Sequence, residues 1–426
     1  MTRKLLDDCF LHDQDRLRHD DAIALLISRV TTVVGEEHVP LDHCAGRTLS
    51  TALHAAQPVP AFTNSAVDGY AFAHRDAVSA ASPGIPVVDR VAAGHARAIA
   101  VPQGHAVRIF TGAALPPGVD TVAMQEDCAV NTIANIPHVT IPVGLKPSAN
   151  VRKAGEDVAA NTELFIRGNI IRPQDIAALA SIGIASVPVY KRLRVAILSS
   201  GDEIIRPGTQ LTFGQVYDAN APMIASLARS AGCDVTDLGI APDREADVEA
   251  VLANAAARFD VIITSGGASR GEEDHLITTL DKLGKRHMWQ LAIKPGRPMA
   301  LGQIGNCVVL GLPGNPVAVF VCFLLYAFPM LRALGGAPWH EPRRLYLPAK
   351  FSFEGRKTGR REFWRGALVD TASGLAVDKY NRDGSGLISG LRWADGLIDI
   401  PEDLPEVRVG QPVGFISFSE FGISSR

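Results

Sequence analysis

The chain has 426 residues, of which 47% are hydrophobic and 20% are charged. This is enough apolar material for several packed cores, which excludes a disordered or low-complexity chain. At about 150 residues per domain, the length predicts about three domains. The 42 basic and 45 acidic residues give a formal charge of -3 and form no basic block, so we expect no nucleic-acid partner.

The cysteines and the apolar segments bear on the compartment of the protein. The six cysteines show no C-x-x-C spacing, which predicts reduced thiols rather than a disulfide framework or a zinc site. The N-terminus, MTRKLLDDCF, is too charged for a secretory signal. The longest apolar run, residues 317–331, carries Pro329 and is shorter than the ~20 residues of a membrane span. We therefore expect a buried helix there, a cytoplasmic protein and no membrane partner.

The first half of the chain changes character twice. Residues 1–61 begin with a charged segment and continue with apolar residues at helical spacing over 22–30. Residues 62–148 alternate short β-branched runs with Gly and Pro turns, which is typical of a small β-rich module. Residues 149–191 return to mixed character, with a helix expected in PQDIAALASIG that ends at Gly183.

Residues 192–338 alternate strands with amphipathic helices. Strands are expected in RVAILSS, DVTDLGI, DVIITSGG, around QLAIK and in CVVLGLPG. Helices are expected through MIASLARSAG, EADVEAVLANAAARF and near DHLITTLDKLG, and a last helix follows Pro316. This order predicts an α/β fold with a doubly wound parallel sheet, right-handed crossovers and helices on both faces.

Residues 339–426 revert to β character. The runs RRLYLPAKFSF, FWRGALV, GLISGLRWADGLIDIP and PVGFISF are separated by turn residues that include Asp383-Gly384 and Asp395-Gly396. We expect a small barrel or sandwich here.

In an open parallel sheet, ligands bind beyond the carboxyl ends of the strands. The candidate binding residues that follow the expected strands are Ser200, Gly201, Ser265, Gly266, Gly267, Ser269, Arg297, Pro313, Gly314, Asn315 and Pro316. In S-G-G-A-S-R-G, exposed backbone N–H groups before a helix are suited to an oxyanion, although an ordinary βα turn has the same composition. Lys294 and Arg297 favour an anionic ligand, and a solvated surface loop is the alternative. P-G-N-P is complete as a helix cap, with Asn315 at the N-cap and Pro316 at the first helical position.

Three carboxylates, Glu203, Asp243 and Asp274, fall at the same edge. Carboxylates beside a phosphate site favour Mg²⁺ or a related divalent ion. Each has a structural alternative: Asp243 and Asp274 as helix-capping or first-turn residues, and Glu203 as a surface residue. The chain has no G-x-x-x-x-G-K-[ST] and no G-x-G-x-x-G after a strand, which excludes a P-loop and disfavours a nucleotide redox enzyme.

Eight segments in one order resemble a known family. They are PAFTNSAVDGYA (60–71), AVRIFTGAALPPGVDTV (106–122), RKAGEDV (152–158), ILSSGDEI (197–204), YDAN (217–220), TSGGASRGEEDH (264–275), LAIKPGRP (291–298) and GLPGNP (311–316). Together they resemble molybdopterin molybdenumtransferases and the E domain of gephyrin over nearly the whole chain.

The resemblance implies four domains and an elongated homodimer. The domains are a composite N-terminal one (1–61 and 149–191), a β-rich lid (62–148), an α/β molybdopterin- and nucleotide-binding domain (192–338) and a C-terminal β-barrel (339–426). The active site is expected between the α/β domain of one subunit and the lid of the other.

The resemblance also implies a reaction in molybdenum cofactor biosynthesis. Adenylylated molybdopterin and molybdate are the expected substrates. With Mg²⁺ or a related ion the adenylyl phosphoanhydride is hydrolysed, AMP leaves, and the dithiolene sulfurs capture molybdenum. The molybdopterin adenylyltransferase and recipient molybdoenzymes are expected partners.

The resemblance also implies roles for single residues. Asp68 and Thr111 match lid residues that act in trans, where the residues alone indicate a hairpin turn and a strand end. Glu203, Asp243, Asp274 and Lys294 match positions that serve the metal, nucleotide and pterin phosphate, with Glu203 and Asp274 as the metal ligands. Asp157 matches an acidic position that is more plausibly structural. Further candidates for a molybdate oxyanion site are Ser389, Arg361 and Arg365.

The sequence departs from the family pattern at three positions. Gln290 stands where several relatives carry a second Lys, Arg270 where a small or apolar residue is common, and His275 where Tyr is frequent. We interpret these as retuning of the pocket. Two alternative functions remain: a non-catalytic scaffold of the gephyrin E-domain type, which loss of the carboxylates would favour, and a relative that only binds or adenylylates a pterin, which the added lid and C-terminal module disfavour.

Overall fold

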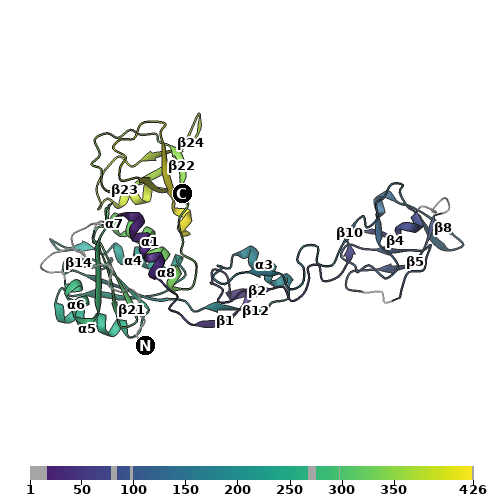
Figure 1. The fold of residues 1–426 in the computed structure, drawn as a ribbon, viewed down its shortest axis with the longest axis horizontal. Coiled ribbons are helices and arrows are strands. Elements are labelled where there is room, and N and C mark those ends of the chain that lie inside the picture. The colour runs from purple at the N-terminus through teal and green to yellow at the C-terminus, as the bar shows by residue number, and fades with distance from the viewer. Residues whose placement is uncertain (1–16, 78–83, 96–98, 267–274, 297, 425–426) are drawn as a thin grey trace.

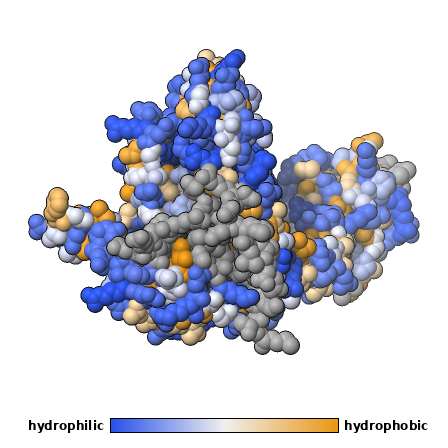
Figure 2. Space-filling view, turned by 60° about the vertical axis from the view of Figure 1, so that its left-hand side comes forward, coloured by the Kyte–Doolittle hydropathy of each residue, from blue (hydrophilic) through white to orange (hydrophobic). Residues whose placement is uncertain are grey.

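The computed structural model describes residues 17–77, 84–95, 99–266, 275–296 and 298–424. These residues form an elongated molecule, in which a β-rich module at one end is joined through a slender middle region to a larger body (Figure 1). On the face turned to the viewer in Figure 2, the described hydrophobic residues are scattered among hydrophilic ones rather than gathered in one large patch.

The larger body contains a six-stranded sheet of order β16-β13-β17-β21-β20-β18. Its first four strands are parallel to one another. Strand β20 is antiparallel to both of its neighbours, β21 and β18. The strands are β13 (Arg194–Ser200), β16 (Asp234–Ala241), β17 (Val261–Ser265), β18 (Lys285–Gln290), β20 (Pro298–Ile304) and β21 (Cys307–Leu312). The expected α/β sheet is therefore confirmed in its centre.

The expectation of an all-parallel sheet is wrong at one edge. Strand β20 was not expected, and a tight turn at Gly305-Asn306 joins it to β21 as an antiparallel hairpin. Gly305 adopts a φ of 59°, a conformation that glycine tolerates in such turns. The segment QLAIK is not one strand either, because β18 ends at Gln290 and Ile293–Lys294 forms β19 in another sheet.

Helices cover both faces of this sheet. On one face, α4 (Asn220–Ser230) and the long helix made of α7 (Pro316–Cys322), η3 (Phe323–Ala327) and α8 (Phe328–Leu334) pack on Val195 and Ile197. On the other face, α5 (Glu245–Ala256) and α6 (His275–Leu283) pack on the alternate residues Ala196 and Leu198. Burial of both faces explains the continuous apolar strands in the sequence. The N-terminal helix α1 (His19–Arg29) also belongs here, because Ala22 and Leu26 are buried in the first core.

The long helix Pro316–Leu334 is the one described segment that is long and apolar enough to cross a membrane by length and composition. Its mean hydropathy is 2.1, and 94% of its most apolar stretch is buried inside the protein, so it is the core helix of this body. A π-helical turn, η3, lies just before Pro329. Proline lacks an N–H and crowds the preceding turn, so a widened turn is a common local adjustment.

In the middle region, strands from the early part of the chain form antiparallel pairs with strands from a later part. The antiparallel pairs are β1 (Glu36–Pro40) with β12 (Ser186–Tyr190), β2 (Leu53–His54) with β11 (Glu163–Phe165), and β3 (Asn64–Ser65) with β10 (Val151–Arg152). Helix α3 (Pro173–Ser181) packs beside them, and Leu179, Val187 and Val189 form their core. The chain between β3 and β10 is thus inserted into this region.

The inserted module is a six-stranded sheet of order β7-β4-β6-β5-β9-β8. The strands are β4 (Gly69–Phe72), β5 (Ile85–Val91), β6 (Ala106–Ile109), β7 (Thr121–Met124), β8 (Ala129–Ile133) and β9 (Ile136–Thr140), with the short helix α2 (His74–Ala77). Only β5 and β6 pair in parallel. This module lies at the end of the molecule opposite the α/β sheet (Figure 1).

The C-terminal region closes into a small barrel. Its strands are β22 (Leu345–Pro348), β23 (Arg361–Thr371), β24 (Gly374–Lys379), β25 (Gly396–Ile400) and β26 (Pro412–Ser417). A bridge between Ala349 and Val377 joins the ends of the sheet, and Trp364, Ile398 and Phe415 fill the interior. The run GLISGLRWADGLIDIP is not strand throughout, because its first part forms α9 (Ile388–Trp393).

Candidate functional site

The carboxyl ends of the parallel strands meet at one edge. Ser199 is in register with Ser265, and Ser265 with Leu312, so the segments after β13, β17 and β21 lie side by side. The N–H of Gly266 donates to the carbonyl of Leu312 at 3.1 Å. A side chain at Gly266 would come within 3.6 Å of the Ser200 carbonyl, and its φ is 92°. The structure thus brings Ser200, Ser265, Gly266 and Pro313 together.

Glu203 follows β13 at this edge. Gly201 has a φ of 132°, and the place of a Cβ on it lies 2.6 Å from Glu203 Oε2, so the glycine lets the carboxylate fold back over the strand end. The Glu203 side chain is exposed, and the described residues offer it no ion pair. The Asp243 N–H donates to Asp202 Oδ1 at 3.1 Å, which ties the Asp243 loop to the Glu203 loop.

The alternative role of Asp243 as a helix cap is wrong. Helix α5 begins after Arg244, which occupies the N-cap position. Within the described part of the chain no three His, Cys, Asp or Glu side chains gather as a metal site. The expected second metal ligand, Asp274, lies outside the described residues, as do Gly267, Ser269, Arg270 and Arg297. The oxygen donors at this edge are of the type that magnesium prefers.

Asp218 is a buried carboxylate that the sequence reasoning did not single out, although it lies in the quoted motif YDAN. It accepts from Ser199 Oγ at 2.6 Å and from an Arg206 guanidinium nitrogen at 3.0 Å. Its other oxygen accepts from the N–H groups of Asn220 and Ala221 at the start of α4. It therefore fixes the segments on both sides of the Glu203 loop.

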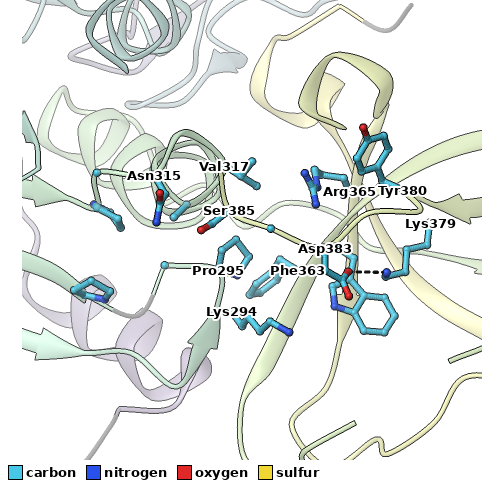
Figure 3. Close-up of a pocket in the computed structure, with 17 residues that line it drawn as sticks. Lys294, Pro295, Asn315, Val317, Phe363, Arg365, Lys379, Tyr380, Asp383 and Ser385 are labelled. Carbon is cyan, nitrogen blue, oxygen red and sulfur yellow. Dashed lines mark hydrogen bonds and ion pairs between the residues drawn. The ribbon is translucent and has the colours of Figure 1, made fainter. Parts of the chain in front are cut away.

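The same turn reaches the P-G-N-P loop. Asn220 Nδ2 donates to the Gly314 carbonyl at 2.7 Å. Asn315 occupies the N-cap position of α7 with Pro316 at the first helical position, as expected, but its side chain makes no capping bond. The Asn315 amide is left to face an adjacent pocket (Figure 3).

This pocket has a volume of about 530 Å³ and lies between the α/β body and the C-terminal barrel. Figure 3 shows Asn315 and Pro295 on one side and Arg365, Tyr380 and Lys379 on the other. Its lining residues with polar side chains are Lys294, Asn315, Trp364, Arg365, Lys379, Tyr380, Asp383 and Ser385. It thus combines expected residues, namely those of the strand-end loops and Arg365 of the barrel, with barrel residues that were not expected, among them Lys379, Tyr380, Asp383 and Ser385.

Lys294 reaches the pocket from a different element than the sequence suggested. It lies on β19, which pairs in parallel with β23 of the barrel, rather than at the end of a strand of the α/β sheet. Its Nζ is 3.4 Å from Glu362 Oε2. The Glu362 carboxylate is buried and is also bonded by Trp364 Nε1 at 2.9 Å and flanked by Arg356 at 3.4 Å. Because that carboxylate is shared with Arg356, a net positive charge remains at the half-exposed lysine.

Arg365 supplies a second cation. Its guanidinium donates to the carbonyls of Leu387 at 3.0 Å and Arg382 at 2.7 Å and stacks on Tyr380 with 4.8 Å to the ring centroid. These partners carry no net charge, so the guanidinium keeps its charge for an anion. Burial lowers the pKa of Arg365, and it remains protonated at neutral pH.

Lys379 is neutralised within the pocket. Its Nζ is 2.9 Å from Asp383 Oδ1, the dashed contact in Figure 3. The hydrogen bond from Lys379 lowers the pKa of Asp383, and the charges of Lys379, Lys294 and Arg365 add to this against burial. The Ser385 carbonyl accepts from the Val317 N–H at 2.9 Å, which fastens this barrel loop to α7.

The other two oxyanion candidates of the barrel do not line the pocket. Arg361 binds both oxygens of Asp399, at 2.7 and 2.9 Å, and Asp20 at 2.8 Å, so its charge is committed to structure. Ser389 is hydrogen-bonded to the Tyr380 hydroxyl at 2.9 Å.

Asp68 and Thr111 meet in the inserted module. Asp68 Oδ1 accepts from the Thr111 N–H at 2.8 Å and from Thr111 Oγ1 at 2.7 Å. These two hydrogen bonds lower the pKa of Asp68. Gly69 begins β4, so Asp68-Gly69 is not a hairpin turn. The pair lies beside the ends of β4 and β6 in the inserted module, which lies at the opposite end of the molecule from the α/β sheet (Figure 1).

The structure also places the remaining motif positions that it describes. The Asp157 side chain is exposed, and its N–H donates to the Val59 carbonyl at 3.1 Å in the middle region. His275 is the first residue of α6, and Gln290 ends β18 opposite Pro298.

Three family models together match most of the chain. They are described as the MoeA N-terminal region (domain I and II) at residues 17–183, a probable molybdopterin binding domain at 196–333, and the MoeA C-terminal region (domain IV) at 341–418.

Named relatives agree with these models. A molybdopterin molybdenumtransferase of Haemophilus influenzae is 34% identical over 94% of this chain and 98% of its own. The molybdopterin molybdenumtransferase 2 of Mycobacterium tuberculosis is 35% identical over 87% of this chain and 92% of its own. The crystal structure of a molybdopterin biosynthesis MoeA protein from Pyrococcus horikosii has a TM-score of 0.80 at 28% identity, over 95% of this chain and 99% of that one.

Proposed function

This chain belongs to the molybdopterin molybdenumtransferase family, and from this premise we propose how its own residues carry out that reaction in molybdenum cofactor biosynthesis. The proposed substrates are molybdate and adenylylated molybdopterin. Water hydrolyses the phosphoanhydride, AMP leaves, and the two dithiolene sulfurs take up molybdenum. The observation that carries this proposal is the pocket with two cations between the α/β body and the barrel.

We assign the molybdate site to this pocket. Lys294 and Arg365 offer positive charge from different elements, and Asn315 and Ser385 add a neutral amide and a hydroxyl. A doubly charged tetrahedral oxyanion needs several charge-assisted donors converging on one place. Lys379 contributes less, because Asp383 already neutralises it. Arg361 and Ser389 are left out of the site.

The carboxylate edge is the proposed place of adenylyl hydrolysis. Glu203 and Asp274 are the proposed ligands of a magnesium or related divalent ion, whose charge would stabilise the phosphoanhydride oxygens. Asp243 lies on the neighbouring loop that Asp202 holds. Ser200, Gly266 and the P-G-N-P loop form the floor beside them, and Asn220 joins the two loops. The pterin therefore spans from this edge to the molybdate pocket.

We further propose a cytoplasmic homodimer with shared active sites. Asp68 and Thr111 form a polar pair, yet they belong to the inserted module, which in one chain lies at the opposite end of the molecule from the α/β sheet (Figure 1). A second copy can present its inserted module, the proposed lid domain (62–148), to the α/β domain (192–338) of the first. The composite N-terminal domain (1–61 and 149–191) then acts as the spacer, and 339–426 forms the proposed barrel domain. The adenylyltransferase and recipient molybdoenzymes are the proposed partners before and after this step.

The test is AMP release by the purified protein with adenylylated molybdopterin and Mg²⁺. Adding molybdate should accelerate release and yield cofactor that activates an apo-molybdoenzyme. Sulfate has the same charge and shape but cannot be captured by the dithiolene, so it should give no active cofactor. AMP release that is absent, or that is the same with and without molybdate, contradicts the proposal.

A further inference from the structure

Two arginines stand side by side in the inserted module. Arg90 on β5 and Arg108 on β6 are register partners in the parallel pair of strands. Like charges at paired positions of a sheet destabilise it. Their juxtaposition beside Asp68 and Thr111 therefore requires a reason other than packing.

Both guanidiniums lie over the same aromatic ring. The Arg90 guanidinium carbon is 4.5 Å from the centroid of Phe110, and that of Arg108 is 5.4 Å from it. Arg108 also lies 5.6 Å from the centroid of Tyr70. The rings hold the two side chains on one face, and stacking leaves the edges of each guanidinium plane able to donate hydrogen bonds.

Their polar partners are neutral. Arg108 donates to the Tyr70 hydroxyl at 3.1 Å and to Gln125 Oε1 at 3.0 Å. Among the residues that the structure describes, neither guanidinium forms an ion pair with a carboxylate. Arg90 is exposed and Arg108 half-buried. The charge of Arg108 helps to lower the pKa of the nearby Asp68, but that single carboxylate leaves a net positive charge on the pair at an accessible surface.

The arginine pair is continuous with the Asp68–Thr111 pair. Phe110 directly precedes Thr111 in the chain. The Gln125 N–H donates to the Asp68 carbonyl at 3.0 Å, while the Gln125 side chain accepts from Arg108. One connected group of side chains therefore presents an aspartate, a threonine hydroxyl and two guanidiniums together.

We propose that Arg90 and Arg108 form a diphosphate-binding site on the lid, which grips the phosphoanhydride of the adenylylated substrate held by the other subunit. This inference rests on the proposed function for the identity of the natural ligand. Two planar forks suit the oxygens of a diphosphate better than those of a single monoanion. Binding there also places Asp68 and Thr111 next to the bond that is hydrolysed.

The first test measures binding without turnover. The full-length protein is treated with phenylglyoxal, which modifies arginines, and modification is read peptide by peptide by mass spectrometry with and without inorganic pyrophosphate. We expect pyrophosphate to slow modification of Arg90 and Arg108 at least about tenfold more than sulfate does. Arg258 is the matched reference, because it is exposed and lies over Phe259 at 5.4 Å. Equal protection of Arg258, or no protection of the pair, overturns the inference.

The second test uses steady-state AMP release by Arg90→Gln, Arg108→Gln and the double variant. Each single change should raise KM for the adenylylated substrate about tenfold, because a charge-assisted hydrogen bond is lost. Arg108→Lys should recover part of the loss, since it restores the charge without the fork. Arg258→Gln should match the wild type.

The two proposals fail differently. If the wild type releases AMP with molybdate while the arginine variants match Arg258→Gln, the lid site is refuted and the proposed function stands. If the wild type shows no AMP release yet pyrophosphate protects the pair, the proposed function is refuted and the diphosphate site stands.

Discussion

The two polar regions of the molecule are built in opposite ways. The pocket between the α/β body and the barrel is a partly open cavity, and the charge of its Lys294 is balanced in part by the buried Glu362. The Asp68–Thr111 pair and the neighbouring arginines are at least partly exposed and belong to the inserted module, at the opposite end of the molecule from the α/β sheet (Figure 1). In the proposed dimer each region supplies part of the active site. One chain would then carry two half-sites, which association of two chains would join.

The wall of the pocket is also anchored in the core of the larger body. Its wall residue Phe363 packs against the buried His19 at 5.3 Å, and His19 Nδ1 lies 2.7 Å from the Tyr326 hydroxyl of the core helix. Preorganised walls of this kind hold a small oxyanion without rearrangement. The lid half can act as an open surface, because in the proposed dimer the other subunit holds the substrate.

The largest effect is expected from breaking the lid half. Asp68→Ala removes the acceptor of both Thr111 hydrogen bonds. We expect AMP release to slow about 10³-fold, by analogy with loss of a preorganised polar group in an active site. Molybdate affinity, measured by calorimetry on the same variant, should stay within about twofold of the wild type, because Asp68 is assigned to the phosphoanhydride and not to the molybdate pocket. A loss of molybdate affinity as large as the loss in the rate of AMP release would contradict the division into two half-sites.

A buried carboxylate of the pocket half should matter for stability. Asp218→Asn removes the ion pair of a side chain that is 2% exposed and loosens Ser199, Arg206 and α4. We expect a loss of about 3 kcal/mol in the free energy of unfolding, measured in urea. Asp237→Asn is the control, because Asp237 binds the same arginine but is 48% exposed, and it should cost less than about 1 kcal/mol. Equal losses would contradict the role of Asp218.

The pocket cations should determine molybdate affinity. Lys294→Ala and Arg365→Gln each remove one cation, and we expect the Kd for molybdate to rise about tenfold in each. Lys379→Met changes the same pocket but removes a charge that Asp383 already neutralises. Its Kd should change less than that of the other two variants. A larger change in Kd for Lys379→Met than for Lys294→Ala and Arg365→Gln would contradict this assignment of the molybdate site.

The smallest effect concerns pH. Burial lowers the pKa of His19 to about 4, and the Arg361 charge adds to this. Because the unfolded chain binds a proton near pH 6.5 and the native chain does not, stability is lost as pH falls from 6.5 toward 4. Between pH 7 and 5.5 the loss should be about 1 kcal/mol. His19→Gln should lack this part of the slope in urea unfolding, and an unchanged slope would contradict the assignment.

The sequence predicted best what depends on long periodic runs. The central strands, such as Arg194–Ser200 and Val261–Ser265, are apolar throughout because both faces are covered, and they were found as expected. The antiparallel edge was missed because its direction depends on the tight turn at Gly305-Asn306. The sequence predicts a strand where the structure has helix Ile388–Trp393, because six residues carry too little periodicity to distinguish a helix from a strand.

Site residues were predictable where a motif carried them. Glu203 and Lys294 came from motif positions, but the sheet to which Lys294 belongs did not, because β19 is too short to leave a pattern. Lys379 and Asp383 are four residues apart, but the segment after β24 is not helical, so their spacing carries no signal of the ion pair. Asp218 was within reach: an Asp two residues before a helix start is a capping signal, here reinforced by Arg206.

The central claim is a site shared between subunits, and purified heterodimers test it most directly. With two affinity tags, Asp68→Ala subunits are paired with Lys294→Ala subunits, and wild-type subunits with Asp68→Ala/Lys294→Ala subunits. With molybdate held below the wild-type Kd, a two-fold dimer with sites in trans gives about half of wild-type AMP release in the first heterodimer, which keeps one intact site, and about a twentieth in the second, which keeps none. A half-active second heterodimer and a far less active first one would show that each site lies within one chain.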